Sequence, residues 1–228
     1  MSASERVGPA MSLAQAADAL GLSRSRVDAL VRSGRVRSRR IGHQHVIDDL
    51  SELSALPRRS GRPMSTRMAW ALLLFADGRP VEWVAPTERS RLRQHLARLR
   101  VDPEPEVLLQ ALVVNRADRI ALHGAEPQGL SADDEVVVSG LSDERSGLSA
   151  GSSFEGYVHV DDLRKVMRRH LLVEPADNRP NVWLHVTEHL PAASTRLQVA
   201  ADLAEHGSAR ERSRARELVH DVVGRVAP

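Results

Sequence analysis

The sequence predicts an α+β protein with a small N-terminal domain over residues 1–56 and a larger mixed α/β domain over 64–228. Between them, the segment PRRSGRP at 57–63 has two prolines, a glycine and three arginines, which is typical of a basic interdomain linker. The charge also changes along the chain. Residues 1–67 hold 12 arginines against 6 acidic residues, whereas residues 101–228 hold 14 basic against 21 acidic residues. A basic front and an acidic rear favour polyanion binding at the N-terminal end.

The first helix is expected over 12–20 (SLAQAADAL), where apolar residues recur at i, i+3, i+4 and i+7 from Leu13. Gly21 can adopt the left-handed conformation that ends a helix. Ser23 can then cap a second helix over 24–33. The inner stripe of this second helix is expected to be Val27, Leu30 and Val31.

Gly34 is expected to end the second helix. Two short strands then follow at 36–40 and 45–47, joined by a turn that would form a wing. A third helix is predicted after them, capped by Asp48 or Asp49 and reaching the end of the domain.

The segment SLAQAADALGLSRSRVDALVRSGRVRSRRIGHQHVIDDLSEL closely resembles the excisionase/MerR-type winged helix-turn-helix family. The family pattern is a short helix ending in LLG, then SRSTVYRLVRSGRL, then RIGRRWRI and a final short helix. This chain keeps the spacing but departs at Asp28, where tyrosine is frequent, and at 43–45, where basic or aromatic wing residues are frequent. The resemblance implies that the second helix enters the major groove and that its first residues reach base edges.

Arginine and hydroxyl side chains are suited to this role, because arginine binds guanine and phosphate bidentately. We expect Arg24 and Arg26 to read bases, and the wing arginines with His43 to contact the backbone or the minor groove. Phosphate contacts are expected from Ser23, Ser25, Arg32 and Arg35. The complete predicted set is Ser23, Arg24, Ser25, Arg26, Arg32, Arg35, Arg37, Arg39, Arg40, His43 and Gln44.

Further arginines could extend the DNA footprint. Three lie in the linker, at Arg58, Arg59 and Arg62, and two lie on a predicted helix, at Arg91 and Arg93. For the helix, a solvated polar face explains the same arginines equally well.

In the larger domain, helices and strands are predicted in alternation. Helices are expected at 65–76, 87–99, 161–170, 195–205 and 209–223, and strands at 120–122, 136–138, 157–160 and 182–186. The apolar run at 107–114 fits either a helix or a strand. The Ser/Gly-rich segment at 143–153 is expected to be a loop.

The order of segments in this domain resembles actinobacterial antitoxins related to the AbiEi group, most of all in the tail DLAEHGSARERSRARELV. The resemblance implies a winged helix-turn-helix followed by an α+β domain. It also implies a nucleotidyltransferase-like toxin as partner, and an operon that the antitoxin represses. The acidic rear could face a basic partner, although a solvated acidic surface is the commoner explanation of such charge.

Catalytic sites are not expected. The string His185-Val-Thr-Glu188-His189 matches the H-x-x-E-H pattern of zinc proteases, but that chemistry requires both histidines on one helical face. Here the string follows a predicted strand. The acidic groups at 133–135 and 161–162 are explained by caps and solvated turns. The absence of cysteine excludes disulfides, thiolate zinc sites and cysteine nucleophiles.

We therefore expect a cytoplasmic protein without cofactor or metal, because the longest apolar run, 68–76, is too short for a membrane span and residues 1–10 lack a hydrophobic signal core. The predicted function is sequence-specific repression of its own operator together with antitoxin activity. The expected partners are double-stranded DNA, a cognate toxin and a second copy in a homodimer. An excisionase-like architectural factor and a stand-alone transcription regulator remain alternatives. An enzyme with a DNA-targeting module is a third, based only on the H-x-x-E-H string.

Overall fold

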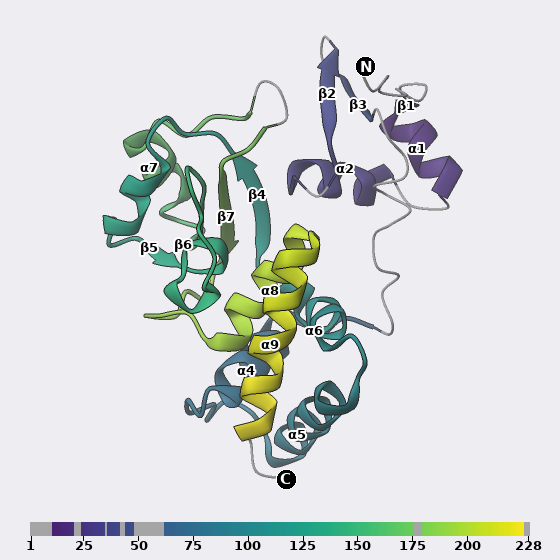
Figure 1. Cartoon of the computed structure of the whole chain (residues 1–228), viewed down its shortest axis with the longest axis vertical. Helices are drawn as coiled ribbons and strands as arrows, with labels where there is room; N and C mark the ends of the chain where they lie inside the picture. The colour runs from purple at the N-terminus through teal and green to yellow at the C-terminus, as the bar shows by residue number, and fades with distance from the viewer. Residues whose placement is uncertain are drawn as a thin grey trace, which may run out of the picture.

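The computed structural model describes residues 11–20, 24–34, 36–41, 44–47, 62–175 and 179–225. Within these residues the chain is an α+β protein with two separate sheets, as the sequence predicts (Figure 1). We call the described residues 11–47 the N-terminal module and residues 62–225 the main body. The predicted helix at 48–56 and the linker residues 57–61 lie outside the described part of the chain.

The N-terminal module consists of two helices and a three-stranded antiparallel sheet. Helices α1 (Leu13–Leu20) and α2 (Arg24–Arg32) lie where the apolar periodicity predicts them. The sheet order is β1-β3-β2, with β1 at Met11–Ser12, β2 at Ser38–Ile41 and β3 at Gln44–Ile47. The two strands predicted at 36–40 and 45–47 are found as an antiparallel pair, with bounds shifted to Ser38–Ile41 and Gln44–Ile47.

Strand β1 is not predicted by the sequence. It forms because Met11 and Ser12 pair with Ile47 and Val46 of β3. Ser12 also caps α1: its hydroxyl accepts a hydrogen bond from the Gln15 amide at 3.3 Å, and its own amide donates to the Gln15 side chain at 3.0 Å. The first two described residues thus fix the start of α1 against the sheet.

A small aliphatic core holds the module together. The described side chains of both predicted helical stripes are buried in it, together with Val36, two residues before β2, and Ile47, the last residue of β3. Its members are Leu13, Ala16, Ala17, Val27, Leu30, Val31, Val36 and Ile47. Burial of this stripe turns the opposite face of α2 outward.

The main body contains a four-stranded sheet in the order β4-β7-β6-β5. Its strands are β4 (Asp118–Leu122), β5 (Val136–Val138), β6 (Phe154–His159) and β7 (Val182–Thr187). The central strands β6 and β7 are parallel, and the outer pairs are antiparallel. A parallel pair needs a crossover connection, and helix α7 (Leu163–Arg169) lies in it.

Each face of this sheet is covered by a different core. On one face Phe154, Val158 and Leu184 pack with Val166 of α7. The other face contributes Tyr157 to a larger helical core. That core is built from α4 (Thr66–Ala76), α5 (Pro86–Val101), α6 (Pro105–Val113), α8 (Arg196–His206) and α9 (Ala209–Arg225).

In the main body, the structure resolves one ambiguous prediction and changes the start of one predicted strand. The run at 107–114, which fits either type of element, is the helix α6 with Pro105 in its first turn, a position that suits proline. Strand β6 begins at Phe154, three residues earlier than predicted, because Glu155 is buried by ion pairing rather than exposed as its charge suggests. Among the described helices, none has the length and apolar character to cross a bilayer.

Candidate nucleic-acid interface

The outer face of α2 carries the polar side chains that the sequence predicts as DNA contacts. Arg24, Ser25 and Arg32 are exposed on this helix, whereas Val27 and Val31 are buried. Arg32 Nε lies 3.1 Å from Asp28 Oδ2, one turn earlier, and both side chains are substantially exposed. Asp28 therefore lowers the net positive charge of this face.

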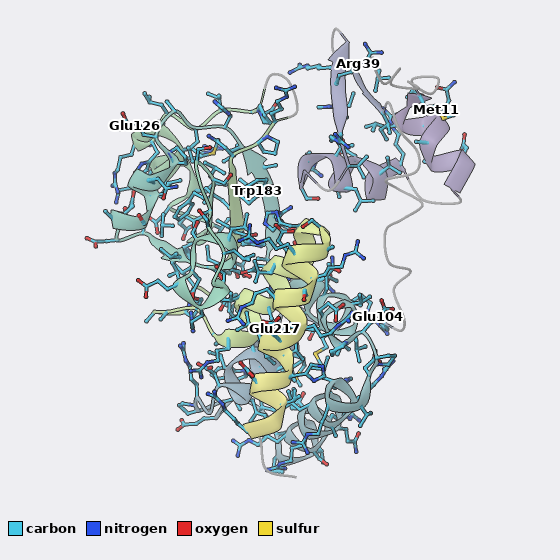
Figure 2. All side chains as sticks on the ribbon, in the orientation of Figure 1. Met11, Arg39, Glu104, Glu126, Trp183 and Glu217 are labelled. Carbon is cyan, nitrogen blue, oxygen red and sulfur yellow. The ribbon has the colours of Figure 1, made fainter. Side chains whose placement is uncertain are left out.

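The hairpin supplies a second group of arginines. Arg37, Arg39 and Arg40 are exposed, and Figure 2 shows Arg39 at the outer part of the module. Arg40 is paired in register with His45, while Ser38 points inward and its hydroxyl lies 3.1 Å from His45 Nδ1. The module thus brings the arginines of α2 and of β2 together on one small scaffold.

Several predicted contact residues cannot be placed in this surface. Ser23, Arg35, His43, Arg58 and Arg59 lie outside the described residues, and for Arg26 and Gln44 only the backbone is described. Arg62 is described and exposed at the start of the main body.

The second arginine group, Arg91 and Arg93 on α5, is also exposed, but it is far from the module. Helix α5 lies near the end of the molecule that holds the C-terminus, whereas the module lies at the opposite end (Figure 1). The Arg93 guanidinium sits 5.7 Å from the centre of the Phe75 ring. The fold therefore does not join this stripe to the arginines of α2 and β2.

A buried ionic cluster in the main body was not predicted from the sequence. Arg116, only 1% exposed, pairs with two carboxylates of α8: its Nη2 lies 2.5 Å from Asp202 Oδ1, and its Nη1 lies 3.0 Å from Glu205 Oε1. Its Nε donates to the Tyr157 hydroxyl at 2.7 Å. Burial alone would lower the pKa of Arg116, but Tyr157, Glu205 and Asp202 together hold it well above its ordinary value.

Glu155 is the second centre of this cluster. Its Oε1 lies 3.0 Å from His185 Nε2, and its Oε2 lies 2.9 Å from His206 Nε2. Burial favours the neutral acid, but the two histidines and Arg119 outweigh it and keep the Glu155 pKa well below its usual range. The side chains of the cluster are almost entirely buried and are paired with one another, so the cluster fixes α8 on the sheet.

The sequence did carry a signal for this cluster. Glu155 and His185 each interrupt an apolar strand, and Asp202 with Glu205 lie on the apolar face of α8. Charged residues are almost never fully buried unless they are paired, so such interruptions indicate paired internal charges.

The two histidines of the H-x-x-E-H string do not lie on one helical face, as a zinc protease would require. His185 lies in strand β7 with its side chain in the buried cluster, and His189 follows the end of that strand. The prediction that the string continues from a strand is confirmed. Across the part of the chain that the structure describes, no group of three or more His, Asp or Glu side chains is arranged to hold a metal.

Comparison of the chain with protein-family models, with curated proteins and with solved structures gives no match. The functional assignment therefore depends on the arginine surface of the N-terminal module and on its local geometry.

Proposed function

We propose that this protein binds double-stranded DNA through the N-terminal module, represses its own operon and acts as the antitoxin of a toxin encoded beside it. The observation that carries the DNA-binding part is the set of exposed arginines that α2 and the β2–β3 hairpin bring together on one small module. The order of two helices and a hairpin supports the interpretation of this module as a winged helix-turn-helix.

In this interpretation α2 is the recognition helix. Its first turn carries Arg24 and Ser25, and the amides at a helix N-terminus attract phosphate. Arg32, the last residue of α2, is in position to contact the DNA backbone. Arg39 and Arg40 on β2 are then placed to contact flanking phosphates or the minor groove.

The main body has the role of a partner-binding domain in this proposal. Residues 101–228, which make up most of it, hold an excess of acidic over basic residues, and an acidic surface suits a partner with a basic face. The antitoxin function is proposed from the resemblance of this region to AbiEi-related antitoxins, for which the partner would be a nucleotidyltransferase-like toxin.

Removing the base-reading arginines should reduce sequence discrimination. We expect Arg24→Ala and Arg26→Ala each to lower the preference for the operator over random DNA by about 1–3 kcal/mol. Fluorescence anisotropy with the upstream region of the gene, and with a random duplex of equal length, measures this directly. Arg91→Ala is the matched control, because it removes an exposed arginine far from the module. An equal loss on both duplexes would reduce the tested arginine to a phosphate contact.

The antitoxin function is tested by growth. The neighbouring gene should arrest growth when induced alone, and co-expression of this protein should restore it. The Arg24→Ala, Arg26→Ala double variant should separate repression from toxin neutralisation. We expect it to derepress an operon reporter while still restoring growth. A harmless neighbouring gene would remove the antitoxin proposal and leave the DNA-binding proposal standing. Strong DNA bending in a circular-permutation gel-shift experiment would instead support the architectural alternative.

A further inference from the structure

The N-terminal module is docked on the edge of the main-body sheet, with α2 beside strand β4 (Figure 1). We propose that this docked arrangement is an autoinhibited, DNA-free state, in which the main body occupies part of the surface that the duplex requires. The proposal rests on the proposed DNA-binding function and adds a means of regulating it.

The closest approach is at the C-terminal end of α2. Gly34 has a φ of +68°, and a Cβ added there would lie 3.1 Å from the Ala121 Cβ and 3.2 Å from Trp183 Nε1. These are tight distances, so the backbone of Gly34 packs directly against side chains of the main body. A residue without a side chain in the left-handed conformation is what allows the contact.

Arg119 of β4 forms the polar part of the contact. Its Nη1 donates a hydrogen bond to the carbonyl oxygen of Ser33, at the negative end of the α2 dipole. Its guanidinium lies 5.4 Å from the centre of the Trp183 ring. Its side chain is 5% exposed, and its Nε lies 3.7 Å from Glu155 and 3.6 Å from Glu205 in the buried cluster. The contact with the module is therefore built on a rigid part of the main body.

Two cavities lie between the module and the main body, and each has acidic main-body groups opposite predicted DNA-contacting arginines. The first, of about 490 Å³, is lined by Ala29 and Arg32 of α2 on one side and by Asp118 and Glu205 on the other. The second, of about 410 Å³, is lined by Arg32 and Arg40 and by Glu174. Arg40 Nη1 lies 3.8 Å from Glu174 Oε2. Glu174 thus stands opposite Arg40, where a phosphate would lie in a complex. Glu205, on the wall of the first cavity, is itself paired with Arg116 and Arg119.

DNA and the main body cannot both lie against α2, for steric reasons. An α-helix with its side chains is about 10–12 Å across, and the major groove of B-DNA is about 12 Å wide, so a recognition helix fills the groove. The walls of the groove then need the space beside the outer face of α2. In the docked arrangement, β4 faces Ala29 and Arg32 across a cavity of about 490 Å³, so the main body bounds the space on this side of α2. DNA binding through α2 therefore requires the module to leave β4.

A reversible crosslink tests this inference in the full-length chain. The protein has no cysteine, so Gly34→Cys with Ala121→Cys introduces the only two thiols. The 3.1 Å separation of the two Cβ positions is close to the roughly 3.5–4.5 Å of a disulfide. A cysteine at 34 also carries left-handed strain, and its Cβ lies 3.2 Å from Trp183 Nε1, so the double variant is compared only with itself in its two redox states. We expect the oxidised form to bind the upstream DNA at least tenfold more weakly than the same sample after reduction. The single variant Ala121→Cys should show no such redox dependence.

The outcomes separate the two proposals. Equal binding by the oxidised and reduced forms would overturn autoinhibition and leave DNA binding intact. Thiol titration selects the samples in which the disulfide is complete, and only these enter the comparison. Failure of the wild-type chain to bind the upstream DNA would overturn the proposed function and this inference together.

A second variant tests the opposite direction without changing charge. Ala121→Phe places a large side chain against Gly34, on an edge strand that tolerates aromatic residues. The wedge should displace the module and strengthen binding to the upstream DNA several-fold. Unchanged or weaker binding by a variant with a wild-type far-UV circular dichroism spectrum would contradict the inference.

Discussion

Replacement of Arg116 by methionine should destabilise the main body by about 3–5 kcal/mol, the usual cost of removing one partner from a buried ion pair. Methionine matches the length of the arginine stem but leaves the Asp202 and Glu205 carboxylates buried without their shared cation. The Tyr157 hydroxyl loses the donor at 2.7 Å as well. The expected result is a large drop in the urea midpoint of unfolding.

The matched control for this experiment is Arg98→Met, which makes the same chemical change on the exposed face of α5. We expect it to change stability by no more than about 0.5 kcal/mol. Adding Asp202→Asn and Glu205→Gln to the Arg116→Met variant should recover part of the loss, because neutral partners no longer require a cation. A single Arg116→Met variant as stable as the control would show that the cluster is not stabilised by this pairing.

Gly140→Ala is expected to be the second most damaging substitution. Gly140 has a φ of +52°, and an added Cβ would overlap the Oε2 atom of Glu155. That carboxylate cannot move aside easily, because it is also held by His206 and by the Leu141 amide at 3.0 Å. Left-handed strain of about 1–2 kcal/mol and overpacking of about 1–3 kcal/mol together predict a loss of about 2–5 kcal/mol.

Gly151→Ala separates the two causes. Gly151 has a similar φ of +58°, but nothing lies within 4 Å of an added Cβ. Its substitution should therefore cost only the backbone strain, and urea unfolding of the two variants gives the steric contribution by difference. If both glycines tolerated alanine equally, the contact between Gly140 and Glu155 would not constrain the main body.

The elements that the sequence predicted well are those with local causes. Helices α1 and α2 follow from apolar periodicity, and the hairpin β2–β3 follows from a glycine-containing turn between two short predicted strands. Strand β1 escaped prediction because its two residues become a strand only by pairing with Val46 and Ile47, about 35 positions later. The run that became α6 was ambiguous because nine residues are too few to separate the two periodicities.

The candidate site was predictable only in part. The exposure of Arg24, Arg32 and Arg39 follows from helical and strand patterns around them. The partners of Arg116 could not be foreseen, since Asp202 lies 86 positions away and nothing local distinguishes this arginine from the solvated ones. The docking of α2 on β4 could not be predicted for the same reason. Gly34 was expected to end a helix, which it does, but its approach to Ala121 depends on tertiary structure.

The strand order of the main body also has a consequence during synthesis. Strand β7 lies between β4 and β6 and is the last of the four to be translated. Until residues 182–187 emerge from the ribosome, β4 has no neighbour in its sheet and the surface that receives α2 is incomplete. The contacts of the N-terminal module span fewer than 40 residues, so it can fold first and independently. A nascent chain would therefore carry a folded, undocked module before the main body can restrain it.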